Sequence, residues 1–164
     1  MASSTGSKMS KEIDVQLSPE EKESLDEIIK EAESDLESEE VLDQSLAIVA
    51  ENEGLDKDAA AKLTIYTVGG VLKNLTEGPL SVMDKHIYAG HTVKLFPSLI
   101  EAGKTGCFVI SNIFVKGVEA GVVYTGNNKN KVPCAWLLCF IENKANVRVS
   151  TPPSIMTVSK ALSY

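Results

Sequence analysis

The sequence predicts an α+β protein in which helices come first and strands follow around one shared core. Three observations predict this class. Apolar residues recur at helical spacing in the first half, β-branched and aromatic runs fill the second half, and helices and strands do not alternate. The expected divisions are a polar tail over residues 1–17, a helical region over 18–90 and a β-rich body over 91–164. A length of 164 residues, 43% of them hydrophobic, suffices for one sizeable core.

The first helix follows the polar tail, in which residues 1–8 are either an added leader before Met9 or native. Ser18 is a helix N-cap, Pro19 suits the first helical position, and Glu21 completes the capping box that Ser18 begins. An apolar stripe then runs along an otherwise acidic helix: Leu25, Ile28, Ile29, Ala32 and Leu36. Such a stripe needs a partner surface. We therefore expect an interaction arm that packs within the fold or on another chain.

Two or three further helices are predicted from apolar spacing and from residues that start or end helices. One covers residues 41–51 and ends at Gly54. Another covers 56–75, is apolar on most sides, and carries a glycine pair that indicates a close helix crossing or a kink. A short fourth helix is expected over 81–88, where a serine and an aspartate three residues later resemble a capping pattern.

About five strands are predicted after residue 90, because Val, Ile, Phe and Thr cluster there between Gly, Asn, Lys and Pro. We expect these strands to be mostly antiparallel, joined by three hairpins. The expected strands are TVKLF (92–96), CFVISNIFV (107–115), GVVYT (121–125), VPCAWLLCFI (132–141) and NVRVS (146–150). The expected hairpin turns are KGVEAG (116–121), GNNKNK (126–131) and ENKAN (142–146).

Charge is divided along the chain. Residues 1–60 hold 18 Asp and Glu against 5 Lys, whereas residues 61–164 hold 5 Asp and Glu against 11 Lys and Arg, within a total net charge of −7. Arg148 is the one arginine in the sequence. A surface of lysines suits non-specific contact with phosphates, because lysine is a point charge without the planar fork that reads base edges.

The residues expected to contact a polyanion lie in predicted turns or on predicted strands. The alternative is that these basic side chains are scattered over a solvated surface. The candidates are Lys94, Lys104, Lys116, Lys129, Lys131 and Arg148.

The triplet Gly103-Lys104-Thr105 ends like a nucleotide-binding phosphate loop, G-x-x-x-x-G-K-[ST]. The first glycine of that motif is missing, because Ser98 stands in its place. A β-branched run follows Thr105, so the helix whose N-terminus would hold the phosphates is also missing. We expect an exposed turn before a strand, not a nucleotide site.

No catalytic, cofactor or metal site is predicted. The three cysteines, Cys107, Cys134 and Cys139, lack zinc-site spacing, and His86 and His91 need not converge with them. An odd number of cysteines without a secretory signal indicates free thiols and a cytoplasmic, reducing compartment. No apolar run reaches the roughly 18 residues of a membrane span, so no transmembrane segment is expected.

The function expected from these features is a non-enzymatic structural or assembly protein. It would form homo-oligomers and contact a polyanionic surface such as RNA, a nucleoprotein or a membrane, with no specific binding to DNA. Small viral matrix and capsid proteins have a similar layout, which is an analogy only. Trp136 is expected either in the core or as an aromatic at the assembly interface. The alternative function is a monomeric adaptor that binds another protein through its acidic amphipathic helix.

Overall fold

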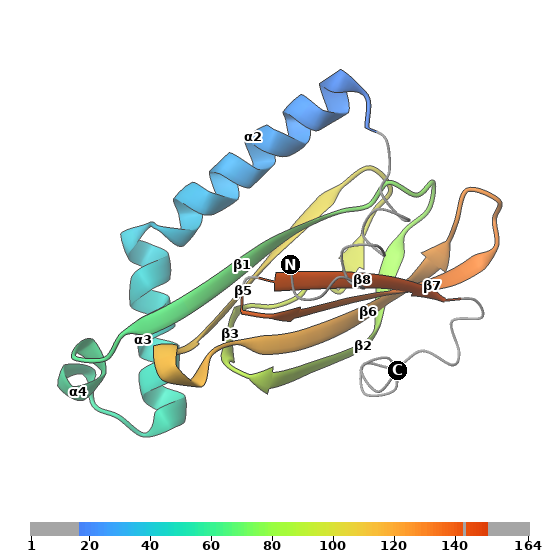
Figure 1. The fold of residues 1–164 in the computed structure, drawn as a ribbon. Coiled ribbons are helices and arrows are strands. Elements are labelled where there is room, and N and C mark those ends of the chain that lie inside the picture. Colours follow the sequence, from blue (N-terminus) through green and yellow to red (C-terminus); the bar gives the residue numbers. More distant parts are fainter. Residues whose placement is uncertain (1–16, 143, 151–164) are drawn as a thin grey trace.

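The computed structural model describes residues 17–142 and 144–150. Their helices come first and pack against a body of two antiparallel sheets, so the predicted α+β class is confirmed (Figure 1). The described strands number eight rather than about five, because β1 and β2 lie where helices were predicted and β4 was not expected. The sheets therefore begin at residue 65 and not near residue 91.

Two of the predicted helices form as expected. α2 (Pro19–Leu36) starts with the predicted capping box, in which the Ser18 hydroxyl accepts from Glu21 N and the Glu21 carboxylate accepts from Ser18 N. α3 (Glu39–Glu53) ends at Gly54, whose φ of 67° is a left-handed conformation that glycine adopts without strain.

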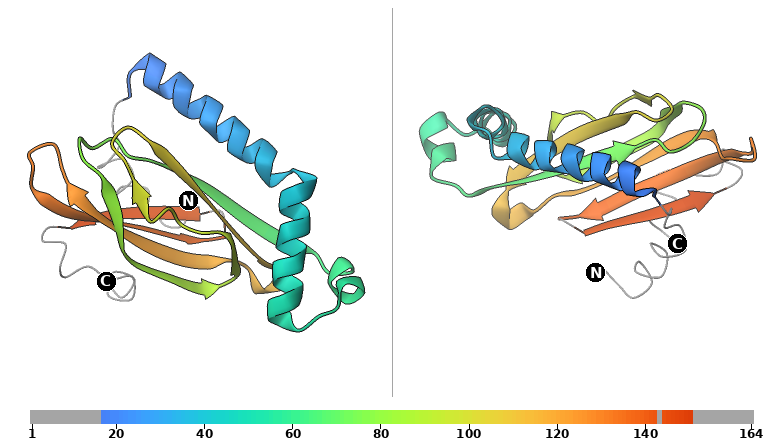
Figure 2. Two further views of the ribbon diagram at one scale, coloured as in Figure 1. Left: turned by 180° about the vertical axis from the view of Figure 1, so that it is seen from behind. Right: turned by 90° about the horizontal axis from the view of Figure 1, so that it is seen from above.

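A two-residue elbow joins the two helices. The Ser38 hydroxyl donates to Asp35 O at 2.6 Å and accepts from Val41 N at 3.3 Å, so one side chain ends α2 and caps α3. Figure 2 shows α2 running along β1, while α3 leaves the elbow in a different direction.

The predicted helix over 56–75 is wrong beyond its first turn. Only α4 (Lys57–Ala61) is helical, capped by Asp56, and β1 (Ile65–Lys73) follows it. A strand covered on both faces is apolar throughout, so it resembles a buried helix in its pattern. The β-branched content of IYTVGGV decides for the strand.

The predicted helix over 81–88 is also wrong, because this segment lies within β2 (Leu80–Ala89). Its first residues alternate between half-buried and exposed, which is the period of a strand with one covered face. The capping-like pair of Ser81 and Asp84 was the misleading signal. In the sheet Ser81 pairs with Thr125 and Asp84 with Val123.

The three-stranded sheet has the order β1-β5-β3, and the five-stranded sheet has the order β4-β2-β6-β7-β8. All pairings are antiparallel among the described strands. The remaining bounds are β3 (His91–Lys94), β4 (Leu99–Ile100), β5 (Thr105–Ile113), the 3-10 turn η1 (Phe114–Lys116), β6 (Glu119–Asn127), β7 (Pro133–Ile141) and β8 (Lys144–Ser150).

The hairpin predicted at 116–121 is wrong, because β5 and β6 belong to different sheets and this segment crosses between them. The hairpins at 126–131 and 142–146 are confirmed, since Asn127 pairs with Pro133 and Ile141 with Lys144.

The core combines residues from both sheets and from the loop after β3. Its aromatic centre is made by Phe96, Phe108 and Phe140, with ring centroids 4.7 Å apart for the first two and 5.2 Å for the last two. Each such pair contributes about 0.5–1.5 kcal/mol beyond the area that it buries. Tyr124 is buried beside them and donates its hydroxyl to Pro97 O at 2.7 Å. Burial raises the pKa of Tyr124 well above its usual range.

Candidate functional site

The arm predicted from the apolar stripe packs within its own chain. α2 contacts β1, and Leu25, Ile28, Ala32 and Leu36 are half-buried, whereas Ile29 is 38% exposed. No residue of α2 is fully buried. The arm is therefore held by a shallow apolar contact over one strand of the three-stranded sheet.

The two glycines of β1 permit close packing on opposite faces of that strand. A Cβ at Gly69 would lie 2.7 Å from Cδ1 of Leu36, so the end of α2 rests directly on the backbone there. A Cβ at Gly70 would lie 2.3 Å from the Phe108 ring, which belongs to the core. The sequence indicated a close approach at this pair, but between helices rather than at a strand.

A carboxylate at the end of α3 forms ion pairs with the body. Glu53 lies 3.2 Å from His91 Nε2 at the start of β3 and 2.6 Å from Lys116 Nζ in η1. The hydrogen bond from Lys116, and then the one with His91, lowers the pKa of Glu53. Lys116, which was expected to contact a polyanion, has this acidic partner in the structure.

Three of the candidate lysines gather at the opposite end of the body, which we call the lysine end. Lys104 lies in the turn between β4 and β5, and Lys129 and Lys131 lie in the β6–β7 hairpin (Figure 1). The loop between β1 and β2 connects the two turns: Asn74 N donates to Lys104 O, and a Cβ at Gly126 would lie 2.8 Å from Pro79 O.

All three of these lysines are exposed, and no ion pair forms at any of them within residues 17–142. Two acids, Glu77 and Glu101, are also exposed on the loops at this end and reduce its net positive charge.

Two asparagines hold the loops of the lysine end in place, and neither was predicted to have this role. Asn74 is fully buried and donates to Gly78 O and Ile100 O, both at 2.8 Å. Asn128 accepts from Asn130 N and Val132 N, which closes the hairpin and allows Lys131 a φ of 60°. For Asn74, the signal in the sequence is an asparagine shortly before a Gly-Pro turn.

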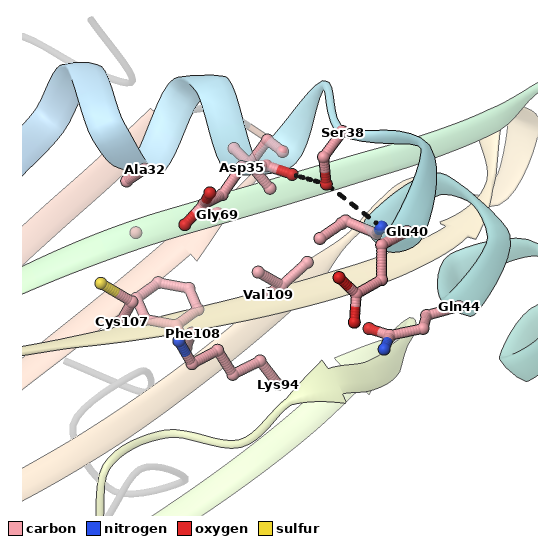
Figure 3. A pocket seen from close by; sticks show the side chains of 13 residues that line it. Ala32, Asp35, Ser38, Glu40, Gln44, Gly69, Lys94, Cys107, Phe108 and Val109 are labelled. Carbon is pink, nitrogen blue, oxygen red and sulfur yellow. Dashed lines mark hydrogen bonds between the residues drawn. The ribbon is translucent and has the colours of Figure 1, made fainter.

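Lys94 lies apart from these lysines, in a cavity of about 280 Å³ beneath the elbow. We call it the elbow cavity. Figure 3 shows Asp35, Ser38, Glu40 and Gln44 on its helix side, with Lys94 and Cys107 on its sheet side.

The remaining predicted positions do not join either group. Trp136 is half-buried on β7 opposite Tyr124, and Arg148 lies on β8 opposite Leu137. Cys107, Cys134 and Cys139 form no disulfide. Lys104 sits in a turn after Gly103, whose φ is 71°, and β5 begins at once at Thr105, as expected.

The part of the chain that the structure describes contains no group of three or more His, Cys, Asp or Glu side chains arranged to hold a metal ion. His86 contacts the Tyr88 ring, and His91 bonds to Glu53. Over the same residues, none of the helices combines the length and the apolarity needed to cross a membrane. Comparisons with protein-family models, with curated proteins and with solved structures found no match to this chain.

Proposed function

We propose that this protein is a non-enzymatic assembly protein that contacts a phosphate-rich surface through its lysine end. The observation that carries the proposal is the grouping of Lys104, Lys129 and Lys131, which come from two loops separated in sequence and are exposed without an acidic partner in the described chain. Exposed lysines bind phosphates through charge and release counterions, without reading sequence.

A lysine triple variant tests this contact. K104Q/K129Q/K131Q should bind RNA or anionic vesicles more weakly, and the slope of log K against log salt should fall by up to about 2 to 3 units. The control is K22Q/K30Q/K62Q, which removes the same charge from exposed positions on the helical side. RNA and phosphatidylserine vesicles are measured separately, so the two sources of phosphate are distinguished.

Removing a negative charge from the lysine end should have the opposite effect on binding. Glu101→Gln removes an exposed acid from the lysine end and should strengthen binding in the same assays. Equal losses in the two lysine triple variants would mean that only total charge matters. No binding to either probe at about 50 mM salt, where phosphate contacts are strongest, would refute the contact.

Self-association through the acidic arm belongs to the same proposal. It is supported by the shallow packing of α2, whose half-buried stripe is able to leave its own β1 and dock on a second copy. Such contacts between unlike surfaces propagate an assembly, as in the viral matrix and capsid proteins that offer the analogy. The second candidate function is a monomeric adaptor whose arm binds another protein, and the packing of α2 on its own sheet favours it.

Mass in solution separates the two candidates. The full chain and a variant lacking residues 1–37 are measured at low and high salt. Oligomers that disappear in the shortened variant support assembly, whether or not they depend on salt. A monomer under all four conditions excludes self-association and leaves the adaptor.

The proposed location is the cytoplasm. Cys107, Cys134 and Cys139 form no disulfide, and cysteines stay reduced in a reducing compartment. Fractionation of cells that produce the protein, with thiols blocked before lysis, tests this point. Recovery outside the cytosol, or with oxidised thiols, would contradict it.

A further inference from the structure

The elbow cavity has a floor made of backbone and small apolar groups. Gly69 has no side chain there, Val109 is buried, and the Cys107 thiol forms part of the same surface. The space lies between the arm and the three-stranded sheet, because the elbow turns α3 away from α2 directly above β1 and β5. A cavity of about 280 Å³ accepts a small molecule rather than a peptide or a nucleotide.

The two walls carry opposite charges. Asp35 and Glu40 supply carboxylates from the helix side, with the amide of Gln44 one helical turn beyond Glu40. Lys94 supplies an ammonium group from β3 on the sheet side. Within residues 17–142, none of the three charged groups takes part in an ion pair, so each is available to a ligand.

We propose that the elbow cavity binds a small dipolar molecule that carries an ammonium group and a carboxylate. The ammonium group lies between Asp35 and Glu40, the carboxylate faces Lys94, and the apolar stem covers Gly69 and Val109. Ser38 has no proton to offer the carboxylate, because its one hydroxyl proton is donated to Asp35 O.

The charge pattern disfavours simpler ligands. A metal ion or a plain amine would meet the carboxylates but also the repulsion of Lys94, and inorganic phosphate would meet the opposite conflict. A dipolar molecule satisfies both walls at once. Since one wall belongs to the arm and the other to the sheet, the bound molecule also ties α2 and α3 to the body.

This site is independent of the proposed polyanion contact, because Lys104, Lys129 and Lys131 do not line the cavity. Either proposal therefore stands when the other fails. Cys107 gives a direct readout, since its thiol lines the cavity and a bound molecule should shield it from a small alkylating reagent.

The probes are ω-amino acids from β-alanine to 8-aminooctanoate, because the series samples different separations of the two charges. Alkylation of the Cys107 peptide is followed by mass spectrometry. At about ten times its dissociation constant, the best probe should slow alkylation roughly tenfold. The alkylamine and the fatty acid of the same length should protect at least about tenfold less at equal concentration.

Substitution of one exposed residue from each wall tests whether both walls contact the ligand. Glu40→Gln and Lys94→Gln should each weaken protection about tenfold, whereas the controls Glu51→Gln and Lys62→Gln, which do not line the cavity, should leave it unchanged. The proposal is overturned if no probe protects Cys107 in the wild-type chain. It is equally overturned if the plain amine protects as well as the amino acid, or if Lys94→Gln has no effect.

Discussion

Single residues decide how closely the layers of this molecule approach one another. Gly69 and Gly70 are neighbours on β1, yet one meets the arm and the other meets the core. At Gly69 the nearest atoms are the methyl groups of Leu36, at the end of a flexible side chain. At Gly70 they belong to the buried Phe108 ring, which is held by Phe96 and Phe140. A ring confined on several sides cannot move aside.

Gly70→Ala should therefore lower the free energy of unfolding by about 1–3 kcal/mol, the usual cost of forcing an extra methyl group into a packed core. Urea denaturation measures this change. The matched control is Gly78→Ala, where a Cβ meets nothing within 4 Å. The control should leave stability unchanged or raise it by up to about 1 kcal/mol through a less flexible unfolded chain. Equal effects in the two variants would mean that the Phe108 contact does not limit packing.

Among the helices and strands, those with local sequence signals are predictable and those that depend on distant residues are not. The Ser18 capping box and the Gly54 helix end depend on residues within a few positions of each other, so they were predictable. β1 was predicted as a helix because a strand covered on both faces is apolar throughout and shows no alternation. Its pairing with β5, about 40 residues away, cannot be seen in the local sequence.

The same contrast applies to the candidate site. The stripe on α2 was visible as a helical period, and exposed lysines in turns were expected. Their grouping was not predictable, because the loop from Asn74 to Pro79 that joins the two lysine turns depends on which strands pair. The role of Glu53 was hidden for the same reason, since His91 and Lys116 are distant in sequence.

The attachment of α3 to the body should depend on pH through Glu53. Its pKa in the folded chain is lowered from 4.5 by Lys116 and then by His91, so the folded state favours the carboxylate. This contribution is fully present above the unfolded pKa and is lost as the pH falls through the lower folded value. The melting temperature of the wild-type chain should therefore drop more steeply below about pH 4.5 than that of Glu53→Gln.

Melting curves between about pH 3 and 6 check this expectation. Glu51→Gln is the control, because Glu51 is exposed on the same helix and makes no ion pair with any residue in 17–142. If the Glu53→Gln profile runs parallel to that of the wild-type chain, the ion pairs of Glu53 do not contribute to the attachment of α3.

At the scale of the whole molecule, the division of charge suggests that the acidic helices are held on the basic body by electrostatic attraction. The contacts indicate otherwise for α2. Within residues 17–142, the ion pairs between helices and body all involve Glu53 of α3, whereas α2 contacts β1 through its apolar stripe. Longer-range attraction remains, as between Glu21 and Lys73, which helps to lower the pKa of Glu21 after its hydrogen bonds with Ser18.

Salt should therefore not release the arm. Exposed charges separated by more than about 3 Å are largely screened at about 1 M salt, but apolar contacts are not weakened by screening. The alkylation rate of Cys107, which lies under the arm, should change less than about twofold between roughly 50 mM and 1 M NaCl.

A variant lacking residues 1–37 gives the rate without the arm and, measured at both salt concentrations, corrects for any effect of salt on the reagent. In Leu36→Ala, which loses the contact with Gly69, the rate should move toward that limit. An increase in the wild-type rate toward the limit at high salt would mean that charge, and not the stripe, holds α2 in place.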